Sequence, residues 1–209
     1  MMSGITNLYR FRKHLIAPFT GRIAMAALAV LIAGCGAFPI IPTKSDYANP
    51  DNSLVFMYIQ VDETSWTPSY IYLRKPDGGR GVMLSWLANG SKKAGDCYLY
   101  AGAVPRGTYE FDELTGTGKD SYVFPQNSQD AYVLKVNKPD VHNLGQYALH
   151  TTKQSGAFSS GSFTFKPATG CPGDKPAYKA ILDNAKNNSM WRSWIEDTRW
   201  HAILVKKSS

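Results

Sequence analysis

From Leu54 onward, apolar residues recur at every second position, and this pattern restricts the possible folds of the chain more than any other feature. In the segment Leu54–Val61, one face is wholly apolar and the other is mixed. The first face holds Val55, Met57, Ile59 and Val61, and the second holds Leu54, Phe56, Tyr58 and Gln60. Successive side chains of a β-strand point to opposite faces of a sheet. The segment therefore predicts a strand in the middle of a sheet, with both faces covered.

Further short segments with the same alternation follow, separated by Pro, Gly, Asn and Asp residues that favour turns. They are predicted as strands over Ser69–Lys75, Arg80–Leu87, Cys97–Ala103, Thr108–Leu114, Tyr122–Phe124, Ala131–Asn137, Leu144–Thr151 and Ser162–Lys166. Many short strands with frequent turns are typical of an antiparallel β-sandwich, whereas strands alternating with helices would indicate a parallel sheet. We therefore predict a mainly β fold, an antiparallel β-sandwich.

After Asp174 the apolar residues change to a helical spacing. Asp174-Lys175-Pro176 is a typical helix start, and the apolar stripe that follows consists of Tyr178, Ile181, Leu182 and Ala185. Asn187–Ser189 interrupts this stripe, and Trp191, Trp194 and Ile195 form one side of a second short helix. The helices, over about 174–197, are expected to pack on the sandwich with their tryptophans buried. Trp200–Val205 is predicted as a closing strand.

The N-terminal residues have the composition of a secretory signal. Residues 1–34 hold four basic residues and no acidic ones, and Ile23–Gly34 is a charge-free apolar run. A helix of that length spans about 18 Å, short of the ~30 Å hydrocarbon core of a bilayer. A basic segment followed by a short apolar run is the pattern of a signal peptide. The rest of the chain carries only +3 of the net charge of +7, without a dense basic patch, which argues against nucleic-acid binding.

Ile32-Ala33-Gly34-Cys35 resembles the lipobox of bacterial lipoproteins, in which an aliphatic residue and two small residues precede a cysteine. The resemblance implies that a lipoprotein signal peptidase cuts between Gly34 and Cys35, and that the sulfur of Cys35 carries a diacylglycerol. Two or three acyl chains hold a protein at a membrane where one chain does not. The competing interpretations are a signal anchor that extends through Ile41 and a cytosolic protein. Pro39 argues against the anchor, because proline interrupts a helix.

The same resemblance indicates a location. Gly36 is not the aspartate that is associated with retention of lipoproteins in the inner membrane. The implied location is the cell envelope, at the periplasmic or surface face of the outer membrane, or the plasma membrane in an organism with one membrane. Residues 36–53 contain three prolines and no periodicity, so residues 35–53 are expected to form a lipidated, flexible tether ahead of a domain at 54–209.

If Cys35 is lipidated, Cys97 and Cys171 remain as a pair in an exported chain. An oxidising compartment favours a disulfide between them, and the alternative is two buried free thiols. A zinc site is disfavoured, because no C-x-x-C motif exists and no histidine has ligand spacing to either cysteine.

The stretch Ala103–Phe111 is similar to a hairpin of transthyretin-like and carboxypeptidase-regulatory-like sandwiches, in which a Pro-x-Gly-x-Tyr turn leads into a strand. The similarity covers fewer than ten residues. It implies a sandwich with a hairpin at Pro105–Gly107.

No motif indicates catalysis, a cofactor or a metal, so we assign no catalytic residue and no cofactor. The prediction is a non-enzymatic binding or structural module, held at the membrane through Cys35 after passage through the lipoprotein processing and sorting machinery. Its partner would be an envelope protein or polymer. Five tyrosines either contact that partner or form cross-strand ladders, namely Tyr58, Tyr70, Tyr72, Tyr98 and Tyr100. The alternatives are an envelope enzyme acting on glycans or peptides, which would need an acid paired with His150 or His201, and an accessory subunit of a secretion or transport assembly.

Overall fold

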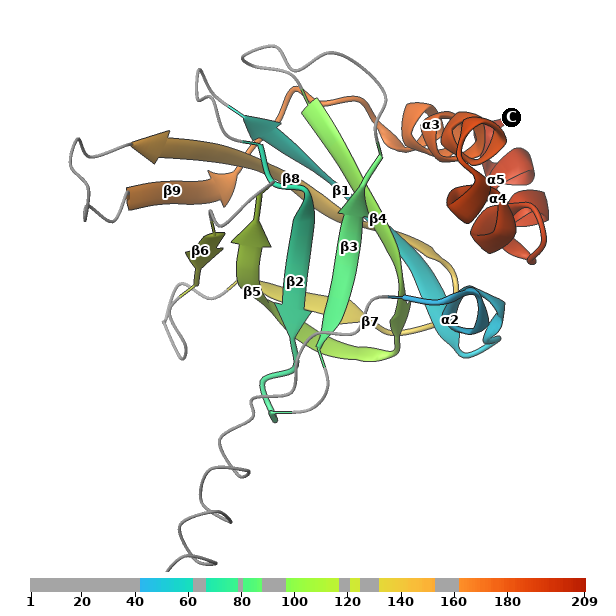
Figure 1. Cartoon of the computed structure of the whole chain (residues 1–209), viewed down its shortest axis with the longest axis horizontal. Coiled ribbons are helices and arrows are strands. Elements are labelled where there is room, and N and C mark those ends of the chain that lie inside the picture. The colour runs from blue at the N-terminus through green and yellow to red at the C-terminus, as the bar shows by residue number, and fades with distance from the viewer. Residues whose placement is uncertain are drawn as a thin grey trace, which may run out of the picture. The chain divides into compact units, whose positions relative to one another are not determined.

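The computed structural model describes residues 42–61, 67–78, 81–87, 97–116, 121–124, 132–152 and 162–209 (Figure 1). The predicted signal peptide and Cys35 lie outside these residues. The helices are α2 (Lys44–Ala48), α3 (Asp174–Asn187), α4 (Ser189–Ile195) and α5 (Trp200–Ser208). The strands are β1 (Asn52–Val61), β2 (Tyr70–Arg74), β3 (Val82–Trp86), β4 (Cys97–Pro105), β5 (Gly107–Thr115), β6 (Ser121–Val123), β7 (Val133–Val136), β8 (Val141–Thr152) and β9 (Ser162–Pro167). The predicted mainly β fold with a C-terminal helical segment is confirmed.

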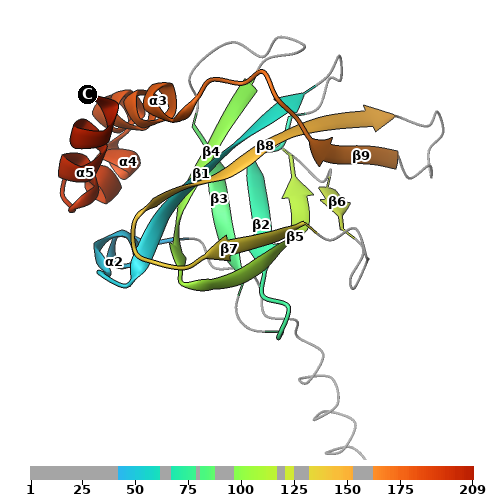
Figure 2. The ribbon, with the colours of Figure 1, turned by 180° about the vertical axis from the view of Figure 1, so that it is seen from behind.

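These strands form one continuous sheet in the order β6-β5-β2-β3-β4-β1-β8-β9, with β7 also paired to β5. The sheet curves until its two ends face each other and is nearly closed (Figures 1 and 2). The expected sandwich would have had two separate sheets, whereas here one curved sheet provides both layers. Within the described strands every pair is antiparallel except β1 and β8, which run parallel.

β1 is the central strand that the alternation predicts, since it pairs with β4 on one side and β8 on the other. Its wholly apolar face lies in an inner core on the inside of the curved sheet, and its mixed face lies in an outer core between the sheet and the helices. The inner-core residues are Val55, Met57, Ile59 and Val61, and the outer-core residues are Leu54, Phe56 and Tyr58. One strand thus contributes to both cores.

The four described helices gather on the outside of the sheet, and we call them the helical cap (Figure 1). The Tyr47 ring of α2 stacks on the Trp194 ring of α4, with ring centroids 4.8 Å apart. The side chain of Asn188 accepts hydrogen bonds from the first turn of α4, which explains why the apolar stripe breaks between α3 and α4. Trp191, Trp194 and Trp200 are all buried, as predicted. Packing therefore buries all three side chains, and none of them is exposed as a platform for a ligand.

The predicted tether extends too far along the chain, because the folded domain already includes Pro42 and α2. Thr43 and Asp46 form a capping box that starts this helix. Tyr47 is fully buried against the helical cap, and the Asn52 side chain donates to the Asp46 carbonyl at 2.9 Å. A single buried aromatic side chain anchors a helix too short to show a periodic pattern, so the sequence offered no helical signal here.

The predicted closing strand at Trp200–Val205 is wrong, since these residues lie in α5. Trp200 and Leu204 are the buried residues, at the i, i+4 spacing of a helix. The Trp200 indole N–H donates to the carbonyl oxygen of Tyr47 at 2.8 Å. A short apolar run fits a helix or a strand equally well, and contact with α2 decides between them.

The predicted hairpin at Pro105–Gly107 is also wrong in its pairing. β4 pairs with β1 and β3, whereas β5 pairs with β2, β6 and β7. The β2–β3 hairpin lies between β4 and β5 in the sheet. The turn is therefore a corner at which the chain passes from one region of the curved sheet to another.

The outer core predicts which helix residues stabilise the domain. Ile181 of α3 is fully buried there, whereas Met190 of α4 is exposed. We expect Ile181→Ala to lower the free energy of unfolding by about 3 kcal/mol, because it leaves a cavity among residues of the sheet and the cap. Met190→Ala, the control, should change it by less than about 0.5 kcal/mol. Denaturant unfolding measures both, and equal effects would contradict this assignment of the core.

Candidate functional site

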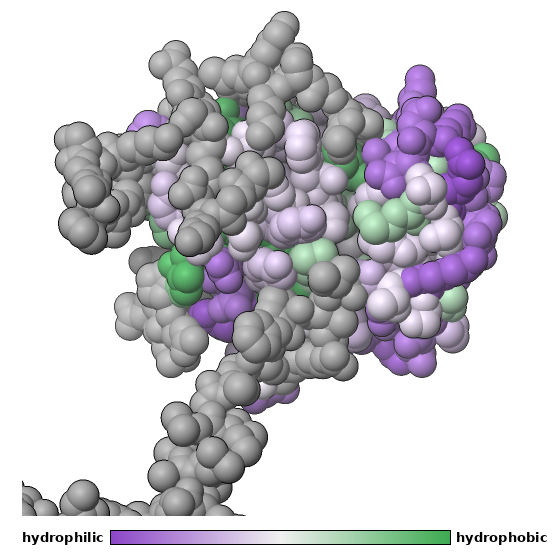
Figure 3. Space-filling model, in the orientation of Figure 1, coloured by the Kyte–Doolittle hydropathy of each residue, from purple (hydrophilic) through white to green (hydrophobic). Residues whose placement is uncertain are grey.

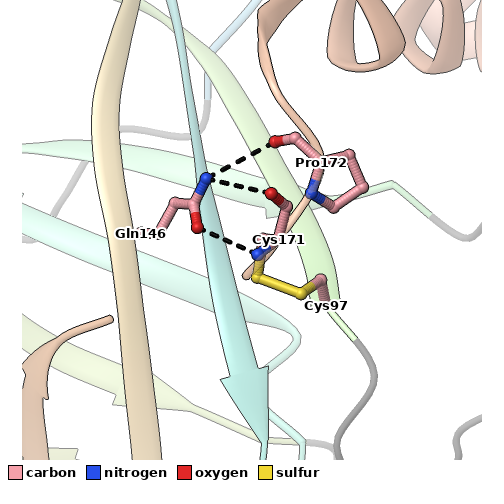
Figure 4. The surroundings of a disulfide bond; sticks show 4 residues. All are labelled: Cys97, Gln146, Cys171 and Pro172. Carbon is pink, nitrogen blue, oxygen red and sulfur yellow. Dashed lines mark hydrogen bonds between the residues drawn. A yellow bond between two sulfur atoms is a disulfide. The ribbon is translucent and has the colours of Figure 1, made fainter. Parts of the chain in front are cut away.

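The predicted disulfide between Cys97 and Cys171 is present (Figure 4). Cys97 is the first residue of β4, and Cys171 lies between β9 and α3, with 5.6 Å between their Cα atoms. The Gln146 side chain of β8 holds the same segment, because its Oε1 accepts from the Cys171 N–H at 3.0 Å and its Nε2 donates to the Cys171 carbonyl at 3.2 Å. The segment that leads into the helical cap is therefore fixed to the sheet covalently and by hydrogen bonds.

The other predicted site residues, Gly34 and Cys35, lie outside the described residues, so cleavage and lipidation remain predictions. Of the five tyrosines considered for partner contact, Tyr58, Tyr98 and Tyr100 are buried, and Tyr100 donates to the Pro68 carbonyl at 2.6 Å. Burial raises the pKa of Tyr58 to about 12 and raises that of Tyr100 well above its ordinary value, so both hydroxyls stay protonated. Tyr70 alone of the five is well exposed, at 40%. These tyrosines do not form a common contact surface.

Seven aromatic rings meet where the two ends of the sheet face each other, and we call this cluster the aromatic seam. Its residues are Phe111, Tyr122, Phe124, Tyr132, Tyr147, Phe163 and Phe165. The Tyr122 ring of β6 lies 5.0 Å from the Phe163 ring of β9. No strand pairing joins β6 to β9 within the described residues. The two ends of the sheet are thus held together by side chains.

The backbone of β9 directs hydrogen-bonding groups toward this seam. The Tyr132 hydroxyl donates to the carbonyl oxygen of Phe165 at 3.0 Å, so this carbonyl points away from β8. Backbone groups of every second residue in a strand point the same way, so Phe163 and Pro167 also face the seam. Pro167 has no N–H, and it occupies a position of β9 at which no N–H is needed to hydrogen-bond with β8. Within the described chain, β9 is therefore an open edge that pairs with β8 alone.

The aromatic seam is partly accessible to solvent. Four of its rings are only partly buried, those of Tyr122, Phe124, Tyr132 and Phe163. On the outer side of the bordering strands, Val123 is 62% exposed and Val133 is 51% exposed. Figure 3 shows hydrophobic surface in the region where Figure 1 places β6. Exposed apolar residues beside partly exposed rings are typical of an interaction surface.

The interior of the seam is uncharged, and the exposed side chains along its borders include cations. Burial raises the pKa of Tyr147, with a further contribution from Tyr132, so the Tyr147 hydroxyl stays protonated and donates to the Leu144 carbonyl at 3.1 Å. Lys135 on β7 and Lys166 on β9 are exposed. The seam therefore presents neutral rings and backbone groups, with exposed lysines on β7 and β9 and the half-buried carboxylate of Glu113 beside Val123 on its borders.

The residues considered for other chemistry are dispersed. His150 is exposed on β8, and His201 is exposed on α5. Within the described ranges, no group of three His, Cys, Asp or Glu residues is placed to hold a metal ion. In the same part of the chain, no helix has the length and apolar character needed to cross a bilayer.

No protein-family model and no curated protein sequence matches this chain. One of the solved structures that match is described as a "putative cell adhesion protein" from Bacteroides fragilis. It is 8% identical in sequence, and the match covers 59% of this chain and 48% of the other chain with a TM-score of 0.29. The chain therefore spans about half the length of that protein, and a likeness at this level carries no argument about function.

Sequence reasoning did not single out the aromatic seam as a site. Its signal is the pair of motifs Tyr122-Val-Phe124 and Phe163-Thr-Phe165, in each of which two aromatic residues are two positions apart. The first motif spans the end of β6, and the second lies within β9. Such motifs also occur in ordinary core strands. Only the curvature of the sheet, which brings β6 to β9, distinguishes them here.

The disulfide should contribute substantially to stability. Cys97→Ala with Cys171→Ala is expected to lower the free energy of unfolding by about 4 kcal/mol, because the bond closes a long loop and so restricts the unfolded chain. The sequence separation of its cysteines is 74 residues. Denaturant unfolding of the oxidised protein and of the double variant measures the difference, and reductant added to the wild type is the matched control. A difference below about 1 kcal/mol would show that the bond is not a main stabiliser.

Proposed function

We propose that this protein is a lipid-anchored lipoprotein of the bacterial envelope, whose β-rich domain binds an extended segment of another envelope component at the aromatic seam. The role is one of binding rather than catalysis. The observation that carries the proposal is the open edge of β9 beside partly exposed rings.

The anchor rests on the leader and on the cysteines. The basic residues, the short apolar run and Ile32-Ala33-Gly34-Cys35 together match the order of a lipoprotein signal. The disulfide between Cys97 and Cys171 supports export, because such bonds persist in oxidising compartments and are rare in the cytosol. Its formation leaves Cys35 as the one cysteine available for lipid attachment.

The binding role rests on two complementary features of the seam. The Phe165 carbonyl already accepts from Tyr132, but the Phe165 N–H and both backbone groups of Phe163 also face away from β8. These groups can pair with the main chain of an added strand, which provides affinity without a specific sequence. The partly exposed rings can receive alternate apolar side chains of that strand, which provides selectivity. Exposed Val123 and Val133 would extend the contact on the outer side of the bordering strands.

Cys35→Ala should abolish incorporation of labelled fatty acid, because the thioether needs the sulfur, and it should leave the signal peptide uncut by the lipoprotein signal peptidase. Metabolic labelling and intact-mass measurement detect both changes. Cys97→Ala, the control, should retain the label. A Cys35→Ala protein that still carries fatty acid would refute the anchor.

A photo-crosslinking residue at Val123 should yield a discrete adduct with an envelope component in living cells, whereas the same residue at exposed Val205 of α5 should not. Phe163→Ser should reduce the Val123 adduct several-fold, because it removes a seam ring. Thr164→Ala, on the outer face of the same strand, should leave the yield unchanged. Adducts of equal yield at Val123 and Val205, or an effect of Thr164→Ala as large as that of Phe163→Ser, would contradict binding at the seam.

A further inference from the structure

The strand registers define two opposite ends of the curved sheet. Asn52, where β1 begins, pairs with Pro105 at the end of β4, and the start of β8 and the corner before β5 lie at this same end. We call it the α2 end, because α2 leads directly into β1. At the opposite end, Val61 pairs with Leu149, and Gln60 pairs with Cys97. We call this the disulfide end.

The chain enters the folded domain at the α2 end. Pro42 is already buried, and Thr43 begins the capping box of α2. The Arg199 side chain donates to the Asn52 carbonyl at 2.6 Å, and Trp200 donates to the carbonyl of Tyr47. The segment from Pro42 to Asn52 is therefore part of the rigid domain, and it adds nothing to the length of a tether.

This position limits how far the domain can lie from a lipid on Cys35. Seven residue steps separate Cys35 from Pro42, and even a fully extended chain of that length spans at most about 25 Å. β1 alone has 10 residues and spans about 30 Å between the two ends of the sheet. If the disulfide end rested on the bilayer, the α2 end would lie farther from the lipid than the chain can reach.

We infer that the α2 end faces the lipid headgroups of the membrane that holds Cys35, and that the disulfide end points away from it. This inference rests on the proposed lipid anchor and adds the surface that contacts the membrane. The exposed residues of α2 and the Pro105–Gly107 corner are the groups brought next to the headgroups. The disulfide-end parts of β8 and β9, with their border of the aromatic seam, are directed away from the bilayer.

The inferred orientation does not rely on charge. Two exposed cations of the α2 end are paired with acids, Lys44 with Asp197 at 2.8 Å and Arg106 with Asp51 at 3.3 Å. All four side chains are more than half exposed, so these pairs are weak and add no net charge. Lys138, whose carbonyl accepts from the Ser53 hydroxyl at the start of β1, is a further exposed cation of this end, and high salt screens its attraction to anionic lipid. The covalent length of the chain sets the orientation, which should therefore be insensitive to salt.

The test uses the lipidated full-length protein in phospholipid vesicles. A photo-crosslinking residue replaces either Arg106 at the α2 end or Thr164 at the disulfide end, where Thr164 of β9 pairs with His150 of β8. Lipid adducts should be several-fold more abundant at Arg106 than at Thr164, in low salt and in about 1 M NaCl, where the Debye length is about 3 Å. An insertion of about 20 Gly and Ser residues after Gly36 should remove most of the difference, because the longer chain lets either end reach the bilayer.

The outcomes separate a failure of the inferred orientation from a failure of the proposed lipid anchor. Equal adducts at the two positions of the acylated protein, or more at Thr164, would overturn the orientation while leaving the anchor intact. Loss of the Arg106 adducts in high salt would also overturn it, because contact would then depend on charge. Protein that carries no acyl group when purified from cells would overturn the anchor and, with it, the orientation.

Discussion

The burial of β1 on both faces is the constraint on which the rest of this structure depends. Its odd-numbered side chains help to fill the inside of the curved sheet, and its even-numbered ones hold the helical cap to the outside. A strand that is apolar on both faces cannot lie at the edge of a sheet, so it requires a neighbour on each side and a layer above and below. β4 and β8 provide the neighbours, and the cap provides the outer layer.

The spacing of apolar residues predicted a strand or helix well where the element buries a regular series of its own side chains. The strand positions, the start of α3 at Asp174 and the break before α4 all follow from alternation, helix-start residues and the asparagines at the break. The disulfide could also be predicted from the sequence, because lipidation of Cys35 would leave two cysteines in an exported chain. Apart from the cysteine count, each of these signals depends on residues close together along the chain.

The remaining features depend on contacts between distant segments. α2 and α5 hold each other through Tyr47 and Trp200, whose sequence separation is 153 residues, and neither segment has a periodic pattern long enough to indicate a helix alone. A single curved sheet and two packed sheets need the same alternation, so the sequence could not distinguish them. The aromatic seam was missed for the same reason, because its rings become neighbours only when β6 approaches β9.

The parallel pairing of β1 and β8 also has a mechanical consequence. With the proposed anchor on Cys35, a partner added to β9 would be joined to β1 through the ladders β9–β8 and β8–β1. Tension between such a partner and the membrane would act along these strands and load their hydrogen bonds in shear, so that many bonds would share the force at once. A pull directed across the strands would open the bonds one after another. The connection from anchor to partner would thus resist tension, and of the helical cap only α2, which lies between the anchor and β1, would carry load.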